Sequence, residues 1–193
     1  MPKDHTILRR GLKPNLYFIT LLYFALGFVS IYFGLLALLC MFLPFVILSH
    51  YGEKRWCHQY CPRASLITLT GKTRRRWRKL PRSWYDGYAK KIMLWYLGLN
   101  LLFITGSTIQ VGIGAMNPMP YIRLFVGIPL WPLPQLISAT GPDWLLHLSY
   151  RFYSMMLSTT LLGVAFSLIW RPRAWCAVCP VGTLSNKLTP PRI

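Results

Sequence analysis

The longest uncharged stretch of the chain sets its structural class. Residues 16–49 are almost wholly apolar and contain no charged side chain. Runs of about 18 or more apolar residues are typical of membrane spans. Further apolar stretches cover residues 92–115 and 152–170, and hydrophobic residues make up 54% of the chain. An ordinary soluble domain has roughly 45–50%. The chain is therefore predicted to be an all-α, polytopic membrane protein.

The first apolar stretch is too long for one upright helix. As a single helix, residues 16–49 would extend about 51 Å at 1.5 Å per residue, whereas the hydrocarbon core of a bilayer is about 30 Å thick. Cationic residues also flank it on both sides. A hairpin of two short spans, turning near residues 27–34, would keep both flanks on the same side. We predict the hairpin, with one long tilted helix as the alternative.

The charge distribution orients the chain. The net charge is +18, and 20 of the 22 Lys and Arg lie in residues 1–15, 50–91 and 171–193. Cations beside spans indicate the cytoplasmic side and contact with anionic lipid headgroups, so nucleic-acid binding is not expected. This places the chain in the cell inner (cytoplasmic) membrane with both termini cytoplasmic. Two cations remain on the outer side. The dense basic segment 72–82 would suit either lipid headgroups or an acidic soluble partner.

These patterns predict a single membrane domain over residues 1–193, with four transmembrane helices as two hairpins. Hairpin 1 and its cysteine motif cover 16–62, followed by a basic cytoplasmic loop over 63–91. Hairpin 2, with spans 92–115 and 152–170, and its cysteine motif cover 92–180, and a tail covers 181–193. Six prolines interrupt residues 116–150. Proline at this density prevents a continuous helix. That stretch is predicted to be an interfacial connector, either a lid over the bundle or one wall of a lipid or quinone pocket.

Each hairpin is followed by a close pair of cysteines and then by a proline. Cys57 and Cys61 precede Pro62, and Cys176 and Cys179 precede Pro180. Two hairpins of the same orientation, related by an axis along the membrane normal, would bring the two pairs together. The proline is expected to stop the chain from continuing as helix and to expose the thiolate. The fifth cysteine, Cys40, lies within an apolar run and is interpreted as a core residue.

Four cysteines in two pairs allow three kinds of chemistry. They supply the four ligands that a [4Fe–4S] cluster needs, and the Cys-Pro ending is also that of ferredoxin cysteine runs. They would equally suit structural zinc, because the pair spacings fit it. They could also be a redox-active dithiol system. Disulfides are not expected on a cytoplasmic face, where thiols stay reduced. His58 lies between the first two cysteines and is an additional candidate ligand or hydrogen-bond donor.

At these residues the sequence resembles the membrane-bound 4Fe-4S binding proteins of the NapH, NosR and CcoG type. These are polyferredoxin-like quinol dehydrogenase or electron-transfer subunits with a four-span core. Their Cys-x3-Cys-Pro motif is matched by residues 57–62, whereas residues 176–180 have one residue fewer between the cysteines. The ferredoxin-type runs of four cysteines and the flavin domain found in some members are absent. The resemblance implies a minimal core that holds at most one cluster.

We therefore expect a membrane electron-transfer subunit with one [4Fe–4S] cluster on Cys57, Cys61, Cys176 and Cys179. It would pass electrons between the quinone pool and a partner redox protein, within a larger membrane oxidoreductase complex. A quinone would bind between helices near the cluster. No acid–base catalytic residue is expected, because the cofactor carries the chemistry. The alternatives are a zinc-binding or metal-insertion assembly protein and a quinone-linked thiol oxidoreductase.

Overall fold

The computed structural model describes residues 14–52, 56–72, 87–124, 128–130, 132–136 and 141–188, and most of these residues are helical. This confirms the predicted helical class. The basic arm at the start of the chain, most of the basic segment 72–82 and the last five residues lie outside the described residues.

The first apolar stretch is divided into two helices. After a turn over Pro14–Leu16, α1 covers Tyr17–Val29; the 3₁₀-helix η3 (Ile31–Leu35) then leads into α2 (Leu36–Tyr51). The break occurs at Ser30, whose backbone is extended (φ −154°, ψ 132°), within the window predicted for the turn. At 1.5 Å per residue, α1 is only about 20 Å long, shorter than the hydrocarbon core.

Among the described residues, three helices are long and apolar enough to cross a membrane. They cover Ile31–Tyr51, Tyr88–Gly112 (α4) and Asp143–Ile169 (α5), with α1 as a shorter apolar helix. Large apolar side chains on these helices face outward; Trp95 on α4 is 74% exposed and Phe42 on α2 is 61% exposed. Apolar surface of this kind suits contact with lipid rather than water. The structure is thus consistent with a membrane protein.

The last long helix begins earlier than the sequence indicated. α5 starts at Asp143, whereas the span was predicted from residue 152. Pro142 precedes it with an extended backbone, and an acidic residue in the first turn favours a helix start there. The extra turns were assigned to the connector because they follow a proline-rich stretch that ends at Pro142. Two of these, His147 and Ser149, are completely buried in the bundle.

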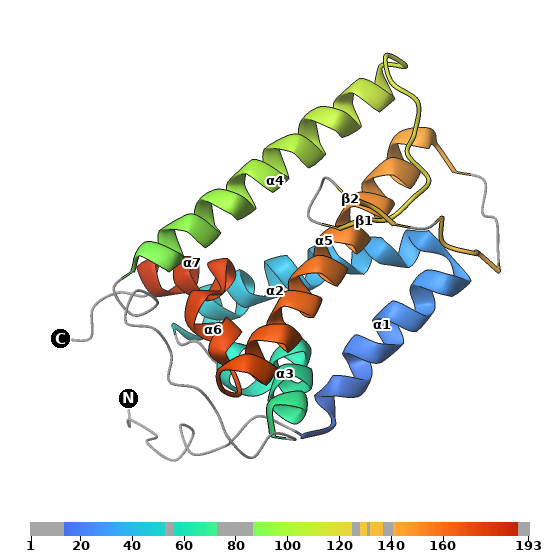
Figure 1. Cartoon of the computed structure of the whole chain (residues 1–193). Coiled ribbons are helices and arrows are strands. Elements are labelled where there is room, and N and C mark those ends of the chain that lie inside the picture. Colours follow the sequence, from blue (N-terminus) through green and yellow to red (C-terminus); the bar gives the residue numbers. More distant parts are fainter. Residues whose placement is uncertain are drawn as a thin grey trace.

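The connector between α4 and α5 contains two short strands that were not predicted. β1 (Arg123–Leu124) pairs antiparallel with β2 (Ile128–Pro129). Ile122, just before β1, is buried in one cluster with Ile31, Tyr150 and Tyr153. The Leu136 N–H also donates to the Phe28 carbonyl at the end of α1, at 3.1 Å. The connector therefore packs over η3 and the first half of α5 (Figure 1).

α5 is the central helix of the bundle, and it buries small residues. Its buried face includes Ser154, Ser158, Gly163 and Ser167, while Leu161 is 47% exposed. Small residues at helix contacts let backbones approach closely, as is typical of membrane bundles. Gly34 in η3 illustrates this, because a Cβ there would lie 2.7 Å from the Ser149 carbonyl oxygen.

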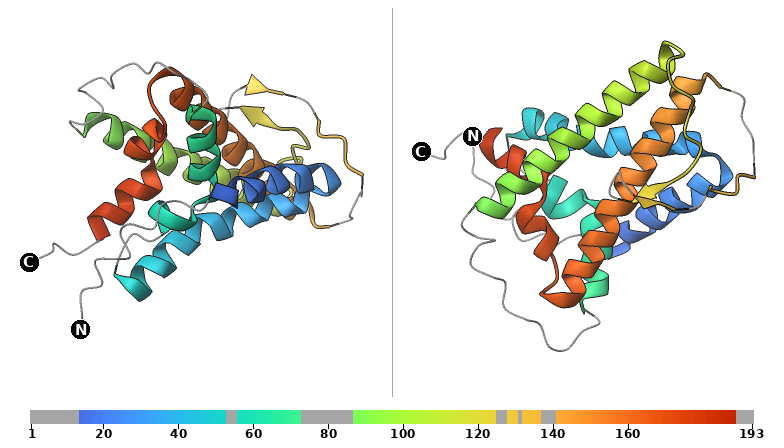
Figure 2. Two further views of the ribbon diagram at one scale, coloured as in Figure 1. Left: turned by 90° about the horizontal axis from the view of Figure 1, so that it is seen from below. Right: turned by 45° about the horizontal axis from the view of Figure 1, so that its top comes forward.

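Among the described residues, three short helices lie in the segments predicted as the basic loop, the second cysteine motif and the tail. These are α3 (Pro62–Lys72), α6 (Ala174–Val178) and α7 (Pro180–Leu188). Figure 2 shows them gathered at one end of the bundle, away from the β1–β2 hairpin. α6 packs against the end of α5, and α7 contacts both α2 and the start of α4. The two cysteine pairs are therefore held between helices and do not lie on open loops.

Candidate iron–sulfur site

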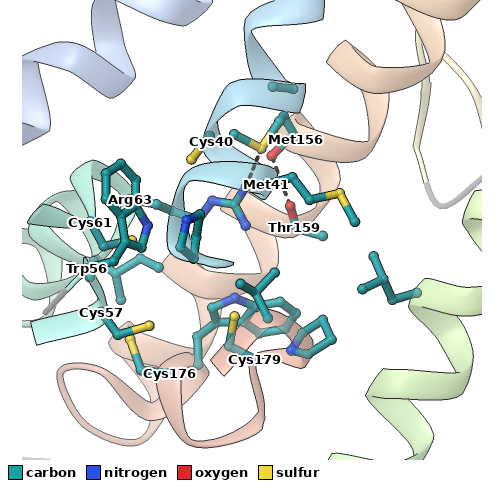
Figure 3. A pocket seen from close by; sticks show the side chains of 18 of the residues that line it. Cys40, Met41, Trp56, Cys57, Cys61, Arg63, Met156, Thr159, Cys176 and Cys179 are labelled. Carbon is teal, nitrogen blue, oxygen red and sulfur yellow. Dashed lines mark hydrogen bonds between the residues drawn. The ribbon is translucent and has the colours of Figure 1, made fainter. Parts of the chain in front are cut away.

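The four predicted site cysteines line one cavity. The cavity, of about 110 Å³, lies where α2, α3, α5, α6 and α7 meet, and its walls include Cys57, Cys61, Cys176 and Cys179. In Figure 3 Cys57 and Cys176, which come from different motifs, point toward each other. The structure thus brings together the two pairs, although more than a hundred residues separate them in the sequence. Cys40 of α2 also lies on the wall.

Each pair ends in the same local structure. Cys57 lies in the π-helical turn η4 (Trp56–Tyr60), and Cys176 lies in α6. Cys61 immediately precedes α3, and its carbonyl accepts the Ser65 N–H at 3.2 Å. Cys179 immediately precedes α7, and its carbonyl accepts the Thr183 N–H at 2.9 Å. Both second cysteines are therefore the capping residues of short helices.

The role predicted for the two prolines was wrong. Pro62 and Pro180 do not stop a helix; each is the first residue of one. Proline suits this position because its missing N–H has no helical partner there and its φ is preset for a helix. The positive ends of two helix dipoles are thereby placed beside Cys61 and Cys179. In addition, the Ala64 N–H donates to the Cys61 thiol.

Arg63 is the cationic residue of the site, and the sequence analysis missed it. It is half-buried on the cavity wall and its Nη2 contacts the sulfur of Met156. Its charge acts on both Cys61 and Cys176, lowering the pKa of each thiol. Arg173, which precedes α6, acts on Cys176 in the same direction. Arg63 directly follows Cys61-Pro62, and this position could have identified it from the sequence. Arg63 was grouped instead with the cations that set the topology.

Burial nevertheless keeps two of the thiols protonated at neutral pH. Burial raises the pKa of Cys61 to about 12, despite the Ala64 N–H and Arg63. Desolvation, together with the neighbouring Cys179, raises the pKa of Cys176 to about 11, although Cys176 is exposed at the surface. Reactive cysteines need the thiolate form at working pH, which these thiols lack without a metal. No two of the five cysteines form a disulfide in the structure.

A buried N–H group in the cavity wall has no partner in the described part of the chain. Trp175 is 3% exposed and lines the cavity between the two pairs. Its ring stacks on Phe166 at 5.7 Å, yet its Nε1 has no hydrogen-bond partner among the described residues. Buried N–H groups are rarely left without an acceptor. The sulfurs of a metal cluster accept such bonds, so this orphaned donor fits a bound iron–sulfur group.

The cysteines are not arranged as a single-ion site. Within the described part of the chain, no three His, Cys, Asp or Glu side chains are grouped closely enough to hold one metal ion. A tetrahedral zinc site requires four ligands on one ion. In a [4Fe–4S] cluster each cysteine binds a different iron, so its ligands surround a larger object. The side chain of His58 lies outside the described residues.

A second, apolar cavity adjoins the cysteine cavity. It has a volume of about 250 Å³ and lies between α1, α2 and α3. Cys40, Arg63 and Met156 form walls of both cavities. Leu39 and Leu22, also on its walls, are 57% and 58% exposed, so the cavity lies at the apolar outer surface. A small apolar molecule could therefore approach the cysteines from the lipid.

Comparison with known families points to the same cofactor. The chain matches the family model described as a 4Fe-4S binding domain over residues 33–81 and 154–190. The two matched segments contain all four site cysteines, together with α2, α3 and the second half of α5. The match supports an iron–sulfur protein and electron transfer as its general function. No curated protein and no solved structure matches the chain.

Proposed function

We propose that the chain is a membrane electron-transfer subunit that holds one [4Fe–4S] cluster on Cys57, Cys61, Cys176 and Cys179. It would pass electrons between the quinone pool and a partner redox protein in an oxidoreductase complex. The observation that carries the proposal is the shared cavity, which is lined by both cysteine pairs. When bound, a cluster of this kind accepts and donates single electrons at a potential set by its surroundings.

The residues around the cysteines suit an anionic group. Arg63, Arg173 and the starts of α3 and α7 place positive charge beside the thiols. The Trp175 N–H offers a hydrogen bond without competition from water, because the ring is buried. These groups would favour the thiolate form and stabilise the more negative, reduced state. No protonation step by a catalytic side chain is required.

The proposed topology has four spans, with the cysteine cavity near the cytoplasmic face. It is supported by the positions of the helix ends. The end of α2 and the start of α4 approach α7, and the end of α5 approaches α6. The opposite ends of α4 and α5 lie beside the Pro-rich connector (Figure 1). Four spans would also place both termini and nearly all cations on one side of the inner membrane.

A quinone is proposed to bind in the apolar cavity between α1, α2 and α3. Its support is the wall shared with the cysteine cavity, which places the two sites next to each other. The partner would be another redox subunit that docks on the cytoplasmic face, where the basic segments would attract an acidic surface. Anionic lipid headgroups would contact the same segments.

The two alternative functions have less support. A zinc-binding assembly protein would need a closer grouping of ligands than the described residues provide. A thiol oxidoreductase would need an activated thiolate, whereas the pKa values of Cys61 and Cys176 are raised.

Quinol-driven reduction in proteoliposomes tests the proposal. A reduced short-chain quinone analogue, added anaerobically, should bleach the iron–sulfur absorbance of the wild-type protein. Leu39→Trp should slow this reduction severalfold, because Leu39 lines the apolar cavity. The control Leu102→Trp places the same bulk on α4, where Leu102 is 68% exposed, and should have no effect. Iron content should be equal in all three proteins. A cluster that quinol never reduces would contradict the proposed function.

A further inference from the structure

A third cavity lies between α4, α5 and β1, apart from the cysteines. It has a volume of about 200 Å³, and its polar walls come from Asn100 and Ser107 of α4, Arg123 of β1, and Arg151 and Ser154 of α5. Arg123 and Arg151 are the two cations that lie outside the three basic stretches of the sequence. The fold brings these two exceptions to the charge rule into one cavity.

Neither arginine has a carboxylate partner among the described residues. Of the four acidic residues, only Asp143 lies within the described residues. It stands eight residues before Arg151 on α5, about 12 Å along the helix axis. The charges of Arg123 and Arg151 act on each other. The cavity therefore has two guanidinium groups that repel one another and that nothing in the described chain neutralises.

Arg123 is held in place by hydrogen bonds, but not all of its N–H donors have an acceptor among the described residues. Its backbone N–H donates to Ser154 Oγ at 3.1 Å, and its Nη2 donates to the Tyr121 hydroxyl at 2.8 Å. These bonds fix the side chain against the bundle. Its Nε is buried and has no hydrogen-bond partner among the described residues. A buried, charged donor without an acceptor is costly unless a ligand supplies the acceptor.

Arg151 has only weak acceptors. Its Nη2 lies 3.7 Å from the sulfur of Met119, and its Nε lies 3.4 Å from Nε2 of His147. The Met119 N–H lies 3.4 Å from Nδ1 of His147, and Nε2 of the same ring lies 3.0 Å from Ser107 Oγ. A neutral imidazole has a single acceptor nitrogen, so it accepts from Met119 or from Arg151 but not from both. The Arg151 guanidinium thus also lacks a strong acceptor.

The depth of the cavity raises the free-energy cost of these two charges. Arg151 is about 12 Å inside the outer end of α5. A charged side chain within a span is disfavoured and usually marks a functional site. Non-helical backbone such as β1 is tolerated at this depth where it lines a polar cavity. The β1–β2 hairpin lies across α5 here (Figure 1).

We propose that this cavity binds a phosphate group, supplied by an anionic phospholipid of the outer leaflet. Guanidinium groups recognise phosphate through paired N–H donors, and Ser and Asn side chains can complete the set. A neutral carbonyl compound would leave two positive charges uncompensated. Phe103, also on the cavity wall, is 58% exposed on α4, so the cavity borders the lipid-facing surface. A lipid would thus fill the site with its headgroup while its chains remain outside.

Native mass spectrometry and thermal unfolding of the full chain in neutral detergent test this inference. The probes are phosphatidylglycerol, phosphatidylcholine and inorganic phosphate. Wild-type protein should retain phosphatidylglycerol over phosphatidylcholine and be stabilised by it. Arg123→Gln and Arg151→Gln should each reduce retention about tenfold or more, since a charge-assisted bond is lost. Lys187→Gln, which removes an exposed cation on α7, should not.

The outcomes separate the two sources of phosphate. Stabilisation by phosphatidylglycerol but not by inorganic phosphate supports a lipid ligand. Equal stabilisation by inorganic phosphate supports the phosphate site with a soluble ligand. No discrimination between the two lipids and no effect of phosphate would overturn the inference, as would unchanged retention in the double Arg→Gln variant. Iron content and helicity show whether each variant is folded. Arg151→Lys keeps the positive charge and should bind the lipid with intermediate affinity. Iron loading does not depend on this cavity. A failure of the lipid-binding inference would therefore leave the proposed function unaffected.

Discussion

At the scale of single residues, Trp175 connects the helix bundle to the cysteine cavity. Its ring packs against Phe166 and Ile67, and its N–H meets no acceptor among the described residues. Trp175→Phe would keep most of the packing and remove the donor. The variant should still bind the cluster but with a lower reduction potential, because a lost hydrogen bond destabilises the reduced state more than the oxidised one.

The expected decrease is on the order of 50 mV, which corresponds to about 1 kcal/mol for one electron. A redox titration followed by EPR measures it. An unchanged potential would mean that the Trp175 N–H does not contact the cluster.

Cys61 and Cys176 of the metal-free protein should react slowly at neutral pH. The pKa of Cys61 is raised to about 12 and that of Cys176 to about 11, so both groups are neutral at pH 7. Their rate of alkylation should rise tenfold per pH unit up to at least pH 10, beyond the ordinary cysteine range. Mass-spectrometric mapping of each cysteine after timed alkylation provides the measurement. Rapid modification of either thiol at pH 7 would instead favour a thiol oxidoreductase.

At the scale of elements, the site depends on how closely α3 and α6 approach α5. A Cβ on Gly163 of α5 would lie 2.5 Å from Ile67 of α3 and 3.4 Å from Trp175 of α6. Gly163→Val should therefore separate these helices and cost about 1–3 kcal/mol. Thermal unfolding should shift downward and iron should be lost. Gly106→Val on α4 is the matched control, because nothing lies within 4 Å of its Cβ. Equal stability of the two variants would contradict this packing role.

The sequence predicted the long helices well and the short ones poorly. Unbroken apolar stretches identified α2, α4 and most of α5, because span length and charge are local properties. The start of α5 was misplaced because the partners of His147 and Arg151 come from other segments. α3 and α7 were missed because proline after cysteine was interpreted as a helix breaker. In both cases it occupies the first helical position, which it favours.

At the scale of the whole molecule, the shared cavity requires both cysteine pairs on the same side of the membrane. Two single cysteine variants test this topology in intact cells: Phe33→Cys in η3, where Phe33 is 39% exposed, and Leu188→Cys at the end of α7, where Leu188 is 59% exposed. A membrane-impermeant maleimide should label the first from outside and the second only after permeabilisation. The parent chain gives the background from native cysteines. Labelling of Leu188→Cys from outside, or no labelling of Phe33→Cys, would contradict four spans.

The site was predictable from the sequence in part. The two Cys-Pro motifs identified the four cysteines, since paired spacing is visible in the sequence itself. Arg63 was hidden among many cations, and the unpartnered N–H of Trp175 becomes apparent only when its neighbours are known. The cavity between α4 and α5 depends on residues 123 and 151 meeting in space, which no local pattern indicates.

The most direct test of the shared-cluster proposal is anaerobic purification with iron, sulfide and zinc analysis and an EPR spectrum of the reduced protein. The proposal predicts about four iron and four sulfide per chain, one per cysteine ligand of a single cluster. Cys61→Ser and Cys179→Ser should each lose the whole signal, although they belong to different motifs, while Cys40→Ser should retain it. Zinc alone, or a signal that survives in either of the first two variants, would contradict a single cluster shared by the two pairs.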